Sequence, residues 1–214
     1  MINTTTTNSR LGRPKSELKR EAILDAAACH FLSEGYERTS MDAIAAAANV
    51  SKQTVYSHFS NKDELFRQCI LSKVLAYGLD VADFDPAMPL DAALTEIGHR
   101  FLRLLGDDDV IRMHRQLIAE TATFPKLANT FYETGPKATI DAIATFIAAN
   151  TAAGQSAVAD PQEAASDFLL LIEGHYMKRR LMHTAVPMTE QERRAKVASA
   201  VDKILRLYDT SEAA

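Results

Sequence analysis

The stretch from Ser51 to His58 carries side-chain types that bind DNA. Gln53 has an amide that can form two hydrogen bonds with adenine in the major groove. Thr54 can offer its methyl group to thymine or its hydroxyl group to a phosphate. Side chains better suited to phosphate oxygens are those of Lys52, Tyr56, His58 and Lys62. This combination favours a recognition helix, in which short polar groups read base edges while flanking donors hold the DNA backbone.

Two apolar residues in the same stretch indicate how such a helix would be held. Val55 and Phe59 are four positions apart, so they share a helical face and should point into a core. Taken one at a time, the polar residues also have ordinary explanations: Lys52 as a solvated lysine, Tyr56 as a packing residue, His58 as a capping group. Their joint occurrence is what favours contact with DNA.

The residues before this stretch predict two helices that would support it. Gly35 is suited to the left-handed conformation that ends a helix, and it follows a helical pattern from about Ser16 to Glu34. Thr39 would begin a short second helix with Asp42 as its capping partner, and Thr39 is also a candidate neighbour of a phosphate. The apolar stripe of the first helix consists of Ile23, Ala26, Ala27 and Phe31.

A tight turn and a connecting helix complete this part of the pattern. Asn49 can adopt a positive φ in a turn, and Ser51 can cap the helix that follows. Two short helices joined by a tight turn are the signature of a helix-turn-helix. Asn61 and Glu64 would start a fourth helix that runs from residue 62 to about residue 79.

The remaining sequence predicts an all-α fold without strands, because its apolar residues recur at helical spacing. The expected helices span residues 90–105, 108–121, 125–134, 136–151, 161–183 and 190–209. Asp160-Pro161 would open the fifth of these, and Thr189 with Glu192 would form a capping box for the last. We therefore expect a flexible basic arm at 1–15, a three-helix DNA-binding domain at 16–62 and a helical domain at 63–214.

The charge distribution agrees with this division. The chain has 24 basic and 28 acidic residues and a net charge of −4, which argues against a nonspecific nucleic-acid coat. Eight basic and six acidic residues occur through Lys62, whereas 16 and 22 follow it. A mildly basic head on an acidic body suits a protein whose first 60 or so residues meet an anion. Arg10, Arg13 and Lys15 could reach the DNA backbone or a minor groove as a flexible arm, or form a merely solvated tail.

Other classes of function find little support. Cys29 and Cys69 form no Cys-x-x-Cys pair, which predicts buried free thiols, with a redox pair as the alternative. No His-x-x-x-His pair, Gly-rich phosphate loop or nucleophile elbow occurs, so an enzyme is the weakest hypothesis, and we expect no metal or cofactor. No apolar run reaches the roughly 20 residues needed to cross a bilayer, so we expect a cytoplasmic, nucleoid-associated protein without a membrane partner.

The N-terminal string closely resembles the DNA-binding domain of the TetR family. The matching residues are Ile23 to Ala27, Phe31, Gly35-Tyr36, Thr39-Ser40, Ile44-Ala45, Val50-Ser51, Thr54, Tyr56, His58-Phe59 and Lys62 to Leu65. Residues from Val110 to about Leu181 look like the AefR-like branch of the family's C-terminal domains. The pairs that carry this second resemblance are Ala119-Glu120, Phe124-Pro125, Gly135-Pro136 and Ala164-Ala165. The sequence departs from the family pattern at His30, Asn49 and Gln53, and Gln53 makes base preference harder to carry over.

The resemblance implies a homodimeric repressor that binds palindromic double-stranded operator DNA and is released by a small-molecule effector. A ligand in the C-terminal domain would tilt the fourth helix and change the separation of the two recognition helices. The expected DNA-binding residues are Arg13, Thr39, Ser51, Lys52, Gln53, Thr54, Tyr56, Ser57, His58 and Lys62. The alternative is an architectural DNA-binding protein without an effector.

The C-terminal domain would supply the ligand pocket and the dimer interface. Candidate pocket residues are Phe101, Met113, His114, Leu117, Phe131, Phe146, Phe168, Ile172, His175 and Tyr176, with Glu120 and Phe124 as further possibilities. Such an aromatic set favours a hydrophobic or amphipathic effector, although core packing explains each residue as well. Candidate interface residues are Phe168, Val197, Val201, Ile204, Leu205 and Tyr208, on two long helices that could form half of an intermolecular four-helix bundle. Alternatively, these helices pack within one subunit.

Overall fold

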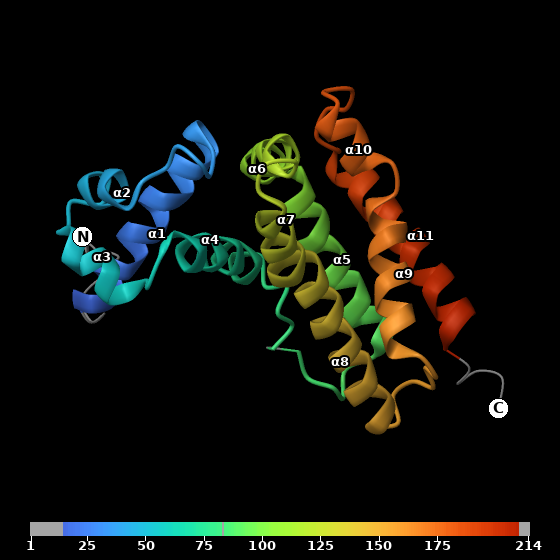
Figure 1. The fold of residues 1–214 in the computed structure, drawn as a ribbon. Helices are drawn as coiled ribbons and strands as arrows, with labels where there is room; N and C mark the ends of the chain where they lie inside the picture. Colours follow the sequence, from blue (N-terminus) through green and yellow to red (C-terminus); the bar gives the residue numbers. More distant parts are fainter. Residues whose placement is uncertain (1–14, 83, 210–214) are drawn as a thin grey trace, which may run out of the picture. The chain divides into compact units, whose positions relative to one another are not determined.

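The computed structural model describes residues 15–82 and 84–209, and its regular secondary structure is helical throughout these ranges (Figure 1). One isolated antiparallel bridge joins Val158 to Asp209. The predicted all-α class is therefore confirmed. None of the described helices is both long and apolar enough to span a bilayer.

The chain forms two compact units, one through Cys69 and the other from Ile70 onward. The helix α4 (Lys62–Ala76) contributes to both. The N-terminal unit extends past the expected boundary at residue 62, because Leu65 and Phe66 are buried in its core. The Phe66 ring meets the Phe31 ring edge-on at 5.3 Å between centroids. The first half of α4 thus belongs to the N-terminal core.

The N-terminal unit begins with α1 (Lys15–Glu34), which buries Ile23, Leu24, Ala27 and Phe31. Gly35 follows with a φ of 86°, as predicted for a helix end. The short helices α2 (Met41–Ala47) and α3 (Lys52–His58) come next. Burial of the α1 stripe against these helices and α4 gives the unit its core.

The expected start of the second helix at Thr39 is wrong by one residue. The N-cap of α2 is Ser40, whose side chain accepts a hydrogen bond from the Ala43 backbone N–H. Thr39 is buried, and its hydroxyl donates to the Gly35 carbonyl at 2.6 Å. Asp42 does not complete a capping box with Thr39 but pairs with Lys52.

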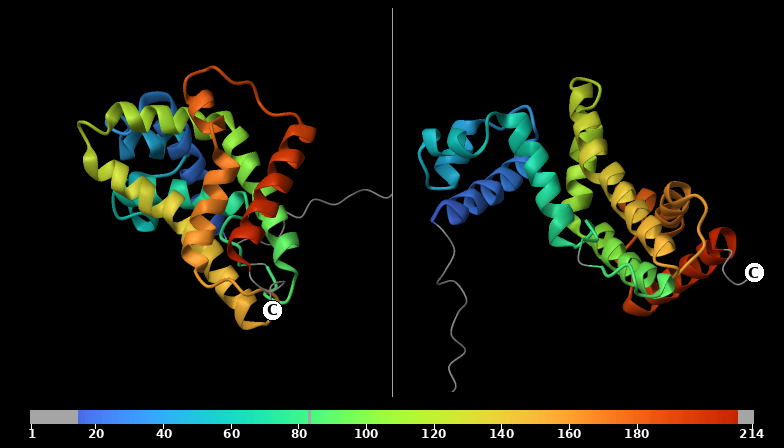
Figure 2. Two further views of the ribbon diagram at one scale, coloured as in Figure 1. Left: turned by 90° about the vertical axis from the view of Figure 1, so that its right-hand side faces the viewer. Right: turned by 90° about the horizontal axis from the view of Figure 1, so that it is seen from below.

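The C-terminal unit is built around four long helices that lie side by side (Figures 1 and 2). They are α5 (Leu90–Gly106), α8 (Ala138–Ala152), α9 (Pro161–Glu173) and α11 (Glu190–Tyr208). Gly98 of α5 allows close packing, because a Cβ atom there would lie 3.0 Å from Val197 and 3.3 Å from Phe168. The shorter elements are α6 (Asp108–Glu120), α7 (Pro125–Tyr132), the π-helix η1 (Glu133–Lys137) and α10 (Tyr176–Leu181).

The single helix expected from residue 161 to about residue 183 is broken. Gly174 ends α9 with a φ of 49° and a ψ of −129°, and a separate short helix follows from Tyr176. A residue with a side chain rarely adopts a positive φ, so Gly174 is the physical cause of the break. The capping box predicted for the last helix is present between Thr189 and Glu192.

The predicted dimer residues need correction, because most of them fill the core of one subunit. Phe168 and Val197 have no exposed surface, and Val201 and Ile204 are also buried. Leu205 is partly buried against the same core. The Tyr208 hydroxyl donates to Asp167 at 2.6 Å within the chain. Packing within one subunit therefore explains these side chains, and the four buried ones are not available to a partner.

Candidate DNA-binding surface and ligand cavity

The inner face of α3 is fixed to the N-terminal core by its two apolar residues. Val55 has no exposed surface, and Phe59 is 1% exposed, which confirms the sequence-based prediction. The Arg20 guanidinium lies 5.4 Å above the Phe59 ring centre and also donates to Gln68 at 2.6 Å. The orientation of α3 is thus set by burial of one face.

The turn before α3 has the predicted geometry. Asn49 has a φ of 53°, and the Val50 N–H donates to the Ala45 carbonyl at 3.0 Å, as in a Schellman motif at the end of α2. Ser51 then caps α3, because its side chain accepts from the Thr54 N–H at 3.1 Å. The turn and the cap together fix where α3 begins.

The outer face of α3 is polar and exposed. The exposed residues of this face are Ser51, Lys52, Gln53, Tyr56 and Ser57. The Thr54 hydroxyl is within hydrogen-bond distance of the Ser51 hydroxyl, and Ser57 donates to the Thr54 carbonyl at 2.7 Å. His58 is partly buried, with its ring centre 6.2 Å from that of Phe59. We define this exposed set as the α3 outer face.

Lys52 is held by a carboxylate on the preceding helix. Its Nζ lies 2.8 Å from the Asp42 carboxylate, and both side chains are more than half exposed. The hydrogen bond and the charge of Asp42 raise the pKa of Lys52. An exposed pair of this kind contributes little to stability, but it holds the ammonium beside α2. A phosphate contact by Lys52 would have to share the ammonium with Asp42.

Lys62 and Thr39 have structural roles that the sequence did not indicate. The Lys62 Nζ donates to the backbone carbonyls of Tyr36, Glu37 and Thr39 at 2.8, 3.2 and 3.0 Å. An ammonium has three hydrogens, so the expected phosphate contact would have to replace one of these bonds. The side chain also lies 4.4 Å from the Tyr36 ring centre. Thr39 is 2% exposed, which removes its side chain from direct phosphate contact. The predicted contact of Arg13 lies outside the described residues.

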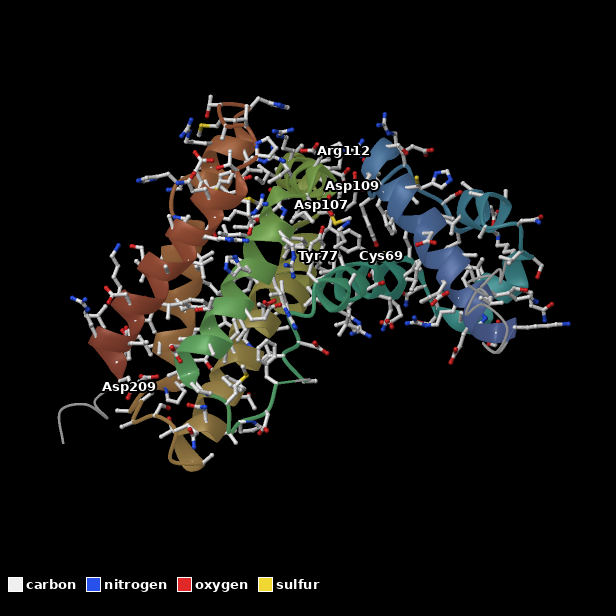
Figure 3. The ribbon with its side chains drawn as sticks, turned by 180° about the vertical axis from the view of Figure 1, so that it is seen from behind. Cys69, Tyr77, Asp107, Asp109, Arg112 and Asp209 are labelled. Atoms are coloured by element: carbon white, nitrogen blue, oxygen red, sulfur yellow. The ribbon has the colours of Figure 1, made fainter. Side chains whose placement is uncertain are left out.

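The two cysteines differ in their surroundings. Cys69, labelled in Figure 3, is buried, and burial raises the pKa of its thiol to about 12. Cys29 is exposed, contrary to the expectation that both thiols are buried. Both are free thiols in the structure. Within the described ranges, no group of three or more His, Cys, Asp or Glu side chains could hold a metal ion.

The C-terminal unit contains a largely apolar cavity of about 510 Å³. Four predicted residues line it: Phe101, Met113, His114 and Phe131. The others do not, and most of them are buried in the core instead: Leu117, Phe146, Phe168, Ile172 and Tyr176. His175 is exposed beside the helix break, and Glu120 and Phe124 also lie outside the cavity wall.

Several cavity residues were not predicted from the sequence. Ile70, Lys73 and Val74 come from the second half of α4, and Glu173 comes from the end of α9. The π-helix η1 adds Gly135, where a Cβ atom would lie 3.3 Å from Ile70. π-Helical turns are rare and often occur at functional sites. The Gly135-Pro136 pair lies within η1, so it was the sequence feature that marked this part of the cavity wall.

A polar cluster joins α4 to the start of α6 at one side of the cavity. Lys73 forms an ion pair with Asp107 at 2.6 Å, and the Tyr77 hydroxyl donates to the same carboxylate at 2.8 Å. Asp107 also caps α6 by accepting from the Asp109 N–H. Tyr77, Asp107 and Asp109 lie near one another in Figure 3. Burial alone would raise the pKa of Asp107, but these hydrogen bonds outweigh burial and lower it. Burial and the bond to Asp107 raise the pKa of Tyr77 to about 12.

Comparison with known proteins covers both units. Residues 23–69 match the family described as bacterial regulatory proteins of the TetR family. Residues 92–210, more than half of the chain, match the C-terminal domain of AefR-like transcriptional repressors. The chain is 40% identical over 73 residues to the uncharacterized HTH-type transcriptional regulator YhgD of Bacillus subtilis, which is 33% of this chain and 38% of that protein.

Two solved structures resemble the chain over nearly its whole length. The flavonoid-responsive regulator FrrA is 31% identical, with a TM-score of 0.71 over 89% of this chain and 97% of that chain. A TetR family transcriptional regulator from Pseudomonas syringae is also 31% identical, with a TM-score of 0.64 over 90% of this chain and 98% of that chain. Both are named as regulators, the class of function that the sequence favoured over an enzyme. Together with the exposed recognition helix, the matches show that this chain belongs to the TetR family of transcriptional regulators.

Proposed function

We propose that this chain is a repressor that binds a palindromic operator as a homodimer and is released by a small, largely apolar effector. One observation carries the proposal: the chain contains both α3, with its exposed polar face, and a largely apolar cavity of about 510 Å³. Cavities of 300–1,000 Å³ with apolar walls are typical of small-molecule sites. As an operator-bound protein, it would be associated with the nucleoid.

In this proposal, the α3 outer face enters the major groove. Gln53 is exposed near the start of α3, where its amide could read an adenine. Tyr56 and Ser57 would contact phosphates, with Lys52 sharing its charge between Asp42 and the backbone. Lys62 and Thr39 bond backbone carbonyls in the segment between α1 and α2, so they would set the position of α3 indirectly.

Dimerisation is proposed because α3 has only seven residues, too few to give nanomolar specificity by itself. The face of α11 that was expected to meet a partner is buried in the core of its own subunit. The interface would therefore use the opposite, exposed face of α11. That face contains Ala195, Ser199 and Asp202. Small side chains allow two helices to approach closely, so a second copy of α11 could pack against these residues.

Release would act through α4. This helix supplies Lys73 and Val74 to the cavity wall, and Lys73 pairs with Asp107 at the start of α6. A ligand that separates these walls would favour one position of α4 over another, which is the differential affinity that coupling requires. FrrA is a flavonoid-responsive regulator by name, which supports a small-molecule response in this chain as well.

The test begins with selection of the bound operator from random-sequence DNA. We expect a two-fold symmetric site that binds two chains, and we expect some compounds of an apolar panel to raise the melting temperature and weaken operator binding together. A selected site without symmetry would contradict the dimer. The alternative, an architectural protein without an effector, would bind DNA equally well in the presence of every compound that binds the cavity.

A further inference from the structure

Glu173 places a carboxyl group in the cavity wall without a partner to balance its charge. It is the last residue of α9, and its side chain is half-buried. Throughout residues 15–82 and 84–209, no hydrogen bond or ion pair to this carboxyl group is found. Burial raises the pKa of Glu173, and the charge of Lys178 opposes this effect only in part. The carboxyl group is therefore without a close counter-ion.

The other charged residue in the wall is already neutralised. Lys73 lies 2.6 Å from the Asp107 carboxylate, so its ammonium is not available to balance Glu173. A ligand that carries a negative charge would thus meet an unbalanced carboxylate. A ligand that carries a positive charge would supply the missing counter-ion.

His114, another polar residue of the wall, also accepts hydrogen bonds. His114 Nδ1 lies 2.7 Å from the Val110 carbonyl oxygen, which can only accept, so Nδ1 carries the hydrogen. Burial lowers the pKa of His114, although the bond to Val110 opposes the shift, so the ring is largely neutral at pH 7 and Nε2 is a bare acceptor. Glu173 and His114 both favour a ligand with hydrogen-bond donors.

The aromatic part of the wall suits the same kind of ligand. Phe101, Phe131 and Tyr132 line the cavity, and the Phe131 ring meets His114 edge-on at 4.8 Å between centroids. Aromatic ring faces attract cations, and they also cover apolar surface. One wall can thus hold both an apolar skeleton and a positive charge.

We propose that the cavity selects an apolar molecule that bears one protonated amine, with Glu173 as its counter-ion. This inference rests on the ligand-responsive function proposed above and specifies its ligand class. Fatty acids and other apolar carboxylates would be excluded, because they would add a second negative charge beside Glu173.

The test uses three probes with one skeleton: 4-biphenylmethylamine, 4-biphenylmethanol and 4-biphenylcarboxylate. Their affinities for the full-length protein are measured by calorimetry at pH 7.5. We expect the amine to bind about tenfold more tightly than the alcohol, a difference of about 1.4 kcal/mol. Glu173→Gln should remove this advantage and leave the affinity for the alcohol within about twofold. Glu163→Gln is the matched control, because Glu163 is exposed in the first turn of the same helix, outside the cavity.

Three results would overturn the charge selection: no binding of the amine at millimolar concentration, equal binding of the alcohol or carboxylate, or an unchanged amine affinity in Glu173→Gln. The proposed function is judged separately, from operator binding in the presence of each probe. A carboxylate that released the operator would leave that function standing and refute this inference. Glu173-dependent amine binding without any change in operator affinity would support this inference and refute effector release.

Discussion

Replacement of Lys62 by methionine separates a structural role from a phosphate contact. Methionine keeps much of the apolar length of the side chain and removes the ammonium that bonds three backbone carbonyls. These carbonyls belong to the segment between α1 and α2. Loss of the three hydrogen bonds should therefore destabilise the part of the N-terminal unit that holds α3 in position. We therefore expect Lys62→Met to reduce the stability of the N-terminal unit.

The magnitude follows from the three bonds. A hydrogen bond to a charged group contributes about 1.5–3 kcal/mol, but Lys62 is only partly buried and water can replace part of the loss. We expect a net loss of about 2–4 kcal/mol. Lys52→Met is the control, because the exposed pair with Asp42 should contribute about 0–1 kcal/mol.

Native-state hydrogen exchange measures this loss within the unit. Amides of α2 and α3 should lose protection by about 30-fold or more in Lys62→Met, because 1.4 kcal/mol corresponds to a factor of ten. Protection in Lys52→Met should be nearly that of the wild type. Unchanged protection in Lys62→Met, together with a fall of about one unit in the salt dependence of DNA binding, would refute the structural role and restore the phosphate contact.

Three further predictions concern α11, α3 and the start of α6. Val201→Glu should lower the free energy of unfolding of the C-terminal unit by about 4 kcal/mol or more in urea, because it buries a charge. The control Lys203→Glu, at an exposed position, should change this free energy by no more than about 0.5 kcal/mol. A folded Val201→Glu monomer would instead support the dimer interface expected from the sequence. Gln53→Ala should cost about 1–3 kcal/mol in operator binding and relax preference at one base pair per half-site, and a uniform loss across half-site variants would assign Gln53 to the backbone. Asp107 has a lowered pKa in the folded chain, so its stabilisation is complete above its unfolded pKa and is lost as the pH falls through the folded value. The stability difference between wild type and Asp107→Asn should therefore shrink below about pH 4, and a constant difference would contradict the role of its ion pair.

The sequence predicted those features that depend on neighbouring residues. Gly35 and Asn49 have the positive φ that was expected, and Ser51 caps α3. Val55 and Phe59 are buried because a spacing of four places both on one helical face. These are local consequences of residue type and period, so the DNA-binding unit was largely predictable.

The features that were missed depend on distant parts of the chain. Lys62 bonds carbonyls more than 20 positions earlier, and nothing in its neighbours indicates this. Helical spacing shows that Val201 lies on an apolar face but does not show whether that face meets the same subunit or a partner. The cavity wall combines residues from α4, α6 and α9, so Glu173 gained its role only through the tertiary fold. Gly174 could have marked the helix break, but glycine is also tolerated inside helices.

The most direct test of a ligand-released, operator-binding regulator is fluorescence anisotropy of the selected operator, titrated with the protein in the presence of cavity-binding compounds. Met113→Trp provides the comparison, because Met113 lines the cavity and a larger side chain there would occupy part of it. We predict that compounds that stabilise the wild type also weaken its operator binding, and that Met113→Trp binds the operator with a diminished response to them. Compounds that occupy the cavity and leave operator affinity unchanged, or an undiminished response in Met113→Trp, would contradict the account.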